Sequence, residues 1–194
     1  MTLEHSDYHQ HNETQSSTTG EGSGQFRAFA DGGGLGADAF NCAAGTILAR
    51  RYEMTEKIGA GGMAVLYRGR DRVLGRDVAV KILDRKFADE KLIRRFHNEA
   101  RAASKLQHKN LVTVFDFGQD GGQPYLIMDY IEGESLSQFM RRCGQLDEQT
   151  ACEIVLQILS GLAHAHRNNV VHRDIKPANI MITIDSSDEV VVKI

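Results

Sequence analysis

The residues best suited to chemistry lie near the end of the chain, in the polar segment 172–179, which apolar β-formers flank on both sides. The Asp174 carboxylate could accept the proton of a hydroxyl group, and Lys176, two positions later, could neutralise a phosphoryl oxygen. The amide oxygen of Asn179 could bind a magnesium ion. The pattern predicts a loop that displays catalytic groups between buried elements. A polar turn without a chemical role would have the same flanks.

A glycine-rich segment, 58–67, could hold the phosphate groups of a ligand. Gly59, Gly61 and Gly62 lie within four positions, between two runs of strand-like residues. Such a hairpin lets backbone N–H groups approach phosphate oxygens without side chains between them. No helix pattern follows, which argues against a Rossmann turn, and the lack of Gly-Lys-Ser/Thr excludes a Walker A loop. The segment alone leaves the question open, because many glycine-rich turns bind nothing.

Lys81 is a lone cation inside the apolar run 77–83, which we predict to be a strand. Alternation along this strand places Ala79 and Lys81 on one face. A buried ammonium group without a partner would be costly, whereas an edge lysine could extend its stem into the solvent. Glu99 offers a partner, because it falls in the apolar stripe of a helix that we predict over 87–106. That stripe consists of Leu92, Phe96, Ala103 and Leu106.

The other elements form two groups around these residues. Further strands are predicted at 52–58, 110–117 and 124–130, with a hairpin turn at 118–123. Helices are predicted at 136–142 and at 147–166, where Asp147 is the N-cap, followed by two strands at 179–182 and 190–194. This order predicts an α+β fold: a five-stranded antiparallel sheet with one helix, and then a mainly helical part.

The composition is that of an ordinary globular protein with a polar beginning. The 194 residues are 41% hydrophobic and 25% charged, and the net charge of −3 suggests neither nucleic acid nor an anionic membrane as a partner. No apolar stretch reaches the length of a transmembrane helix. The cysteines Cys42, Cys143 and Cys152 are scattered and odd in number, which favours a reducing cytoplasm over a disulfide framework. We expect residues 1–45 to form a disordered polar, glycine-rich tail.

The polar segment resembles the catalytic loop of eukaryotic-type protein kinases, as found in bacteria. It reads His172-Arg173-Asp174, with Asn179 five residues after the aspartate. The lysine at the second position after Asp174, Lys176, is the residue type that the serine/threonine branch of that family has there, so the loop resembles that branch.

Two further motifs extend the resemblance. The segment 78–81, Val-Ala-Val-Lys, is similar to the kinase strand whose lysine holds the α- and β-phosphates of ATP. The segment 59–66 resembles the loop Gly-x-Gly-x-x-Gly-x-Val, with Ala64 in place of the third glycine and Leu66 in place of the valine. Both replacements are small or conservative, so we expect the loop still to cover a nucleotide.

The resemblance implies a two-lobe protein-kinase-like fold. It places the complete five-stranded small lobe at 46–130, and the hinge with the first part of the large lobe at 131–194. It also implies ATP and Mg²⁺ as cofactors and a protein substrate with a serine or threonine hydroxyl; the cytoplasmic location is expected from the cysteines. No nucleic-acid partner or membrane segment is expected.

The resemblance also assigns roles to single residues. Asp174 would be the base, Lys176 would stabilise the transferred phosphoryl group, and Asn179 would bind the metal. Lys81, paired with Glu99, would orient the phosphates. The nucleotide would lie against Ile58, Gly59, Ala60, Gly61, Gly62, Met63, Ala64, Val65, Leu66, Ala79, Lys81, Met128, Asp129, Ile131 and Met181.

In the family, an Asp-Phe-Gly motif follows the last strand and its aspartate holds magnesium, but the chain ends at Ile194. We therefore expect an incomplete chain that is inactive alone. The alternative is a non-catalytic half-kinase that binds another kinase or a scaffold. A small-molecule phosphotransferase of similar fold is disfavoured by the His-Arg-Asp motif followed by Lys176.

Overall fold

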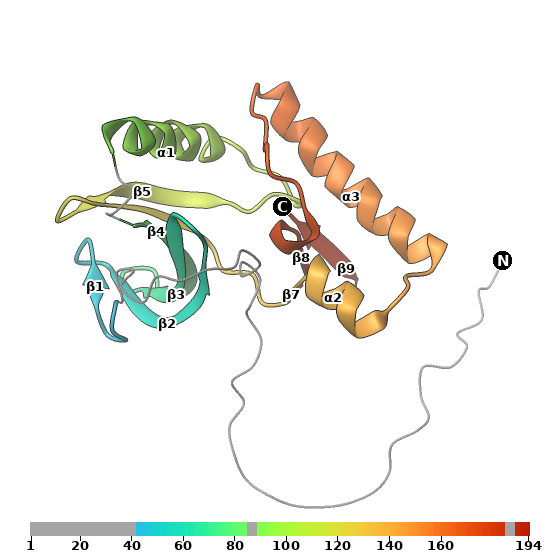
Figure 1. The fold of residues 1–194 in the computed structure, drawn as a ribbon, viewed down its shortest axis with the longest axis horizontal. Helices are drawn as coiled ribbons and strands as arrows, with labels where there is room; N and C mark the ends of the chain where they lie inside the picture. Colours follow the sequence, from blue (N-terminus) through green and yellow to red (C-terminus); the bar gives the residue numbers. More distant parts are fainter. Residues whose placement is uncertain (1–41, 85–88, 185–188) are drawn as a thin grey trace, which may run out of the picture.

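The computed structural model describes residues 42–84, 89–184 and 189–194, so most of the predicted tail, residues 1–41, lies outside the described residues. The elements form two parts, a curved sheet with helix α1 and a smaller sheet with helices α2 and α3 (Figure 1). The strands of the larger sheet are β1 (Ile47–Leu48), β2 (Tyr52–Ala60), β3 (Ala64–Asp71), β4 (Arg76–Leu83), β5 (Val114–Asp120) and β6 (Gln123–Asp129).

The larger sheet is antiparallel throughout, in the order β1-β2-β3-β4-β6-β5. The five predicted strands are present, and the two-residue β1 adds a sixth at the edge. Alternation along β4 separates the two faces of the sheet as expected. Val78, Val80 and Ile82 are at most 1% exposed and lie in the main core of this part, whereas Ala79 belongs to a separate cluster on the opposite face.

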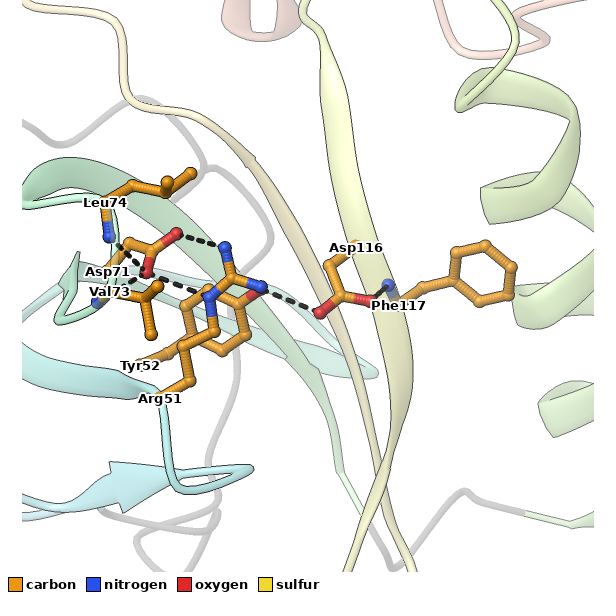
Figure 2. A network of polar contacts seen from close by, with 7 residues as sticks. All are labelled: Arg51, Tyr52, Asp71, Val73, Leu74, Asp116 and Phe117. Carbon is orange, nitrogen blue, oxygen red and sulfur yellow. Dashed lines mark hydrogen bonds and ion pairs between the residues drawn. The ribbon is translucent and has the colours of Figure 1, made fainter.

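Polar contacts tie three strands together beside this core (Figure 2). The Asp71 carboxylate, at the end of β3, accepts hydrogen bonds from Arg51 Nε at 2.9 Å and Nη2 at 2.7 Å. Tyr52 Oη, on β2, donates to Asp116 Oδ2 on β5 at 2.7 Å. Because Arg51 and Tyr52 are adjacent, the start of β2 is fixed to β3 and β5 at once.

Helix α1 (Glu90–Ala103) begins at the N-cap Asp89, whose carboxylate accepts the Leu92 N–H at 2.6 Å. The predicted start at 87 lies outside the described residues. The helix packs beside β5 through half-buried Phe96 and His97 and buried Ala100, and the His97 ring lies 6.1 Å from that of Phe117.

The predicted inward face of α1 was right for Leu92, Phe96 and Ala103, which are half-buried, and wrong for Glu99. The helix turns by about 100° per residue, and the contact with β5 brings His97 and Ala100 inward beside Phe96. Glu99 lies outside this face and is exposed to solvent.

The predicted boundaries around β5 were also wrong. The hairpin turn consists of Gly121 and Gly122 alone, at φ values of 54° and 78° that suit glycine. Residues 110–112 do not join the larger sheet. Instead, the Val112 N–H donates to the Ile194 carbonyl at 2.9 Å, and the Ile194 N–H donates to the Asn110 carbonyl at 3.1 Å.

The second part contains β7 (Glu134–Ser135), α2 (Leu136–Cys143), α3 (Glu148–Arg167), a 3-10 turn (Pro177–Asn179), β8 (Met181–Ile184) and β9 (Val190–Lys193). Asp147 caps α3 as predicted, since its carboxylate accepts the Thr150 N–H at 2.8 Å. A second core joins these elements, with Ile154 of α3 and Val192 of β9 at its centre. In the part of the chain that the structure describes, no helix is both long and apolar enough to cross a membrane.

Candidate functional site

The predicted catalytic residues lie together in the loop between α3 and β8. Asp174 Oδ2 is 3.1 Å from Lys176 Nζ, and the Asn179 side-chain amide donates to the same oxygen at 2.7 Å and to the Asp174 carbonyl at 2.9 Å. These contacts hold the pKa of Asp174 below its ordinary value, first through Lys176 and then through Asn179. The carboxylate is ionised at neutral pH, and its side chain is 62% exposed, so another molecule can reach it.

The backbone of this loop is held in a conformation that places Asp174 at the surface. Arg173 has a φ of 64°, in the left-handed region that residues other than glycine rarely adopt. The Pro177–Asn179 turn follows, and Ile180 is buried in the second core. Such strain is typical of functional sites, where surrounding packing maintains a local conformation that the chain would otherwise avoid.

The donor atoms at this loop suit part of a magnesium site. Both side-chain hydrogen bonds of Asn179 use its amide nitrogen, so among the described contacts its Oδ1 is unoccupied and available to a cation. Magnesium prefers one or two protein oxygens completed by water and substrate phosphates. No group of three His, Cys, Asp or Glu side chains that could hold a metal occurs within residues 42–84, 89–184 and 189–194. The protein atoms therefore fit a site that a phosphate ligand completes, not a full metal cage.

Lys81 faces this loop from the larger sheet. Desolvation by the surrounding protein lowers the pKa of Lys81, while the charges of Glu99 and Asp174 act in the opposite direction. The side chain nevertheless stays accessible to solvent. The predicted ion pair with Glu99 is not formed as a direct contact among the described residues, because α1 presents Glu99 to the solvent. Lys81 and Asp174 are thus brought near each other from positions far apart in the sequence.

An apolar surface adjoins Lys81 on the same face of the sheet. Buried Ile58, Leu66 and Ala79 form one cluster, against which Met128 and Tyr130 pack. Ile131 and Met181 form a second small cluster at the junction with β8. These residues come from both parts of the molecule, and together they could contact a flat apolar group.

Val65 is the exception among the predicted nucleotide contacts. It is 3% exposed, and its side chain lies in the main core, on the face opposite Leu66. Only its backbone can face a ligand on the Ala79 side, because neighbouring strand residues point to opposite faces.

The backbone after β6 offers a hydrogen-bond donor. The Asp129 N–H donates to the Thr113 carbonyl at 2.9 Å, so Asp129 can offer a ligand only its carbonyl oxygen. The Ile131 N–H has no hydrogen-bond partner within the ranges that the structure describes. Since nearly all buried backbone donors are paired in folded proteins, this N–H is suited to a ligand with an acceptor atom.

The glycine-rich segment forms the predicted hairpin between β2 and β3. The Gly61 N–H donates to the Ala64 carbonyl at 2.8 Å, and the Asp84 N–H donates to the Met63 carbonyl at 2.8 Å, which holds the tip near the end of β4. Gly62 faces open space, since a Cβ added there would meet nothing within 4 Å. Neither glycine adopts a positive φ. Neither backbone strain nor a close neighbouring atom therefore requires glycine at Gly61 or Gly62.

Our sequence interpretation missed two residues here. Tyr130 packs in the apolar cluster, and its position two residues after Met128 would have placed it on the same face. His172 was named in the motif but given no role. It is half-buried, and its Nδ1 has no hydrogen-bond partner among the described residues. Burial lowers its pKa, while the charge of Asp174 opposes that effect.

Comparison with known proteins agrees with this arrangement. Residues 52–194 match the protein kinase domain family. The serine/threonine-protein kinase PrkC of Bacillus subtilis is 45% identical over 139 residues, which cover 71% of this chain and 22% of PrkC. The serine/threonine-protein kinase PknL of Mycobacterium tuberculosis is 42% identical over 140 residues, which cover 72% of this chain and 35% of PknL.

Solved structures show the same fold. The crystal structure of the Mycobacterium tuberculosis PknI kinase domain aligns with a TM-score of 0.68 at 29% identity and covers 78% of this chain and 61% of that domain. The chain spans about a fifth to a third of the length of the curated relatives named above.

Proposed function

Since the chain belongs to the protein kinase family, we propose that it carries the nucleotide-binding and catalytic-loop residues of an ATP-dependent serine/threonine protein kinase. One observation carries this proposal: the Asp174 carboxylate contacts both Lys176 and Asn179, and Lys81 lies near enough for its charge to interact with Asp174. A carboxylate, two cations and a free amide oxygen at one place suit phosphoryl transfer, which depends mainly on positioning and electrostatics.

Asp174 accepts the proton of the substrate hydroxyl as the hydroxyl oxygen bonds to the γ-phosphorus of ATP. The bond between that phosphorus and the bridging oxygen breaks, and ADP leaves. The low pKa of Asp174 keeps this carboxylate ionised and ready at neutral pH. Lys176, 3.1 Å from Asp174, is placed to neutralise charge on the transferred phosphoryl group.

Lys81 orients the α- and β-phosphates, and the open backbone at Gly61 and Gly62 covers them. A bound magnesium ion would neutralise charge on the phosphates, and Asn179 Oδ1 is the protein atom that would hold it. Glu99 would support Lys81 only after α1 turned or moved towards the sheet, since it is exposed here.

The adenine group lies between Ala79 and Leu66 on one side and Met181 on the other. The Asp129 carbonyl and the Ile131 N–H, which lacks a partner among the described residues, meet the polar edge of the base. We propose the division between small lobe and hinge at residues 130 and 131, a serine- or threonine-containing protein as the substrate, and the cytoplasm as the location.

The test uses the gene product at its native length. Asp174→Asn removes the proposed base and is expected to lower phosphate transfer from ATP to a protein substrate by about 10²- to 10⁴-fold. ATP affinity, measured by titration calorimetry, should stay within about twofold, because the base does not bind the nucleotide. Glu153→Gln on α3, which removes an exposed carboxylate remote from this loop, is the control. Unreduced transfer by Asp174→Asn would refute the assigned role.

The second candidate is a non-catalytic binding module, favoured by the lack of a direct Lys81–Glu99 contact and by apolar residues exposed on α3. Val155, Leu156 and Leu159 are 50%, 65% and 54% exposed.

The intact mass of the native gene product separates the two candidates. A mass well above that of 194 residues favours the kinase, and a mass equal to it favours the binding module.

A further inference from the structure

We propose that Arg68 is a positioning residue for nucleotide binding: its guanidinium group holds the Tyr130 ring and thereby fixes the backbone of residues 129–131, against which adenine would lie. This inference rests on the proposed function, because it concerns the same adenine position.

The strand register brings Arg68 and Tyr130 to one face of the sheet. Arg68 pairs with Ala79 across β3 and β4, and Ala79 pairs with Met128 across β4 and β6. Directly paired residues point to the same face, and Tyr130 follows Met128 by two positions. The row therefore begins with Arg68, passes through two proposed adenine contacts, and ends beside Tyr130.

The contact itself is close. The Arg68 Cζ atom lies 4.6 Å from the centre of the Tyr130 ring, within the range of a cation–π interaction. Asp77 on β4 fixes the guanidinium plane, since its Oδ2 accepts from Arg68 Nε at 3.2 Å and from Nη2 at 2.5 Å. The Arg68 and Asp77 side chains are 34% and 29% exposed, so solvent screens this pair only in part. The pairing raises the pKa of Arg68 and lowers that of Asp77, and both groups stay charged at neutral pH.

Tyr130 lies between the two backbone groups that would meet adenine. β6 ends at Asp129, and Tyr130 is the next residue along the chain. On either side of it lie the Asp129 carbonyl and the Ile131 N–H, the two groups proposed to meet adenine. A ring held against the sheet limits the rotation of both peptide groups, which is preorganisation of a binding site.

A purely structural role would give a different result from a positioning role. If Arg68 only stabilised the fold, its loss would weaken the binding of every ligand or of none. Among the described contacts, the Arg68 side chain touches Tyr130 and Asp77 and none of the proposed phosphate-binding residues. Loss of positioning should therefore weaken only ligands that contain adenine. Arg70 supplies a matched control: its Nη1 pairs with Asp77 Oδ1 at 3.2 Å, and its side chain is 55% exposed. No cation–π contact to Tyr130 is made by Arg70 among the described residues.

The experiment measures dissociation constants of the native-length protein for ATP, adenosine and inorganic tripolyphosphate by titration calorimetry. The variants are Arg68→Ala, Arg68→Lys, Tyr130→Leu, Arg70→Ala, and the double variant that combines Arg68→Ala with Tyr130→Leu. Urea unfolding of each variant verifies that it is folded.

We expect Arg68→Ala to weaken ATP and adenosine by the same factor, about five- to tenfold, and to leave tripolyphosphate unchanged. Arg68→Lys should recover part of the loss, because an ammonium group still attracts the ring but lacks the planar fork. In the Tyr130→Leu background, Arg68→Ala should have no further effect. Arg70→Ala should bind all three ligands as the wild type does.

Three outcomes would overturn the inference while leaving the proposed function intact: unchanged adenosine affinity in Arg68→Ala, an equal loss for tripolyphosphate, or an equal loss in Arg70→Ala. If Arg68→Ala fails to unfold cooperatively, Tyr130→Leu is measured in its place, and an adenosine affinity that Tyr130→Leu leaves unchanged then overturns the inference. If the wild type binds neither ATP nor adenosine, the proposed function itself fails, and the inference fails with it.

Discussion

Replacing Asp71 by asparagine tests the ionic contact that joins the start of β2 to the end of β3. The Asp71 side chain is 1% exposed and accepts two hydrogen bonds from Arg51, and the N–H groups of Val73 and Leu74 donate to its Oδ1 at 3.0 and 3.2 Å (Figure 2). The pairing with Arg51, followed by the backbone donors, lowers the pKa of Asp71 from 3.8 to about 2. Asparagine keeps the size of the side chain, but its amide group would point a donor at other donors.

The pKa difference gives the size of the effect. A shift from 3.8 to about 2 corresponds to about 2 kcal/mol of folding free energy at neutral pH. The Arg51 side chain is 35% exposed, so solvent screening reduces the expected loss in Asp71→Asn to about 1–2 kcal/mol. The folded-state pKa of Asp71 is depressed. Its contribution is therefore complete above the unfolded-state pKa and disappears as the pH falls towards about 2.

Urea unfolding followed by circular dichroism at pH 7, 5, 4 and 3 measures this difference. The stability gap between wild type and Asp71→Asn should be constant from pH 7 to about 5 and shrink below that. Glu53→Gln is the control, because the Glu53–Arg72 pair is 3.8 Å long and both side chains are about half exposed, at 44% and 54%. The expected effect of the control is below about 0.5 kcal/mol. A gap that stays constant down to pH 3, or a gap no larger than that of the control, would refute the reasoning.

Two further predictions concern the proposed site and its support. Desolvation lowers the pKa of Lys81, so at pH 8 an amine-directed reagent should modify Lys81 faster than the exposed Lys91 of α1, as read by peptide mass spectrometry. Glu99→Gln removes a charge that raises the pKa of Lys81, so the variant should be labelled faster at Lys81. Slower labelling of Lys81 in this variant would contradict the electrostatic explanation. Gly133→Ala places a Cβ against the Ile182 carbonyl and should destabilise the protein by about 1–3 kcal/mol in urea unfolding. Gly62→Ala, which meets open space, should cost much less, and equal costs would rule out the steric explanation.

Short-range sequence patterns predicted much of the candidate site. Asp174, Lys176 and Asn179 lie within six positions, so a single tight loop brings them into contact wherever the rest of the chain goes. The two faces of β4 followed from alternation, because side chains of a strand point to opposite sides whatever sheet it joins. The roles of Asp174, Lys176 and Asn179 in phosphate transfer remain predictions.

The orientation of α1 could not be read in this way. A helix turns by about 100° per residue, so an error of one position moves a side chain from the buried face to the solvent. Leu92 and Phe96 lie on the inward face as predicted, but contact with Phe117 on β5 also brings His97 and Ala100 inward. Glu99 is left in the solvent.

The sequence by itself determined the chemistry of the loop at 172–179, the hairpin of glycines and the alternation around Lys81, because each depends on neighbours in the chain. Only the tertiary structure decided that Glu99 faces solvent, that residues 110–112 pair with Ile194, and that Arg68 lies over Tyr130. These contacts join residues tens of positions apart. They depend on strand order, register and helix rotation, which follow from how the whole molecule buries its apolar surface and which no local pattern specifies.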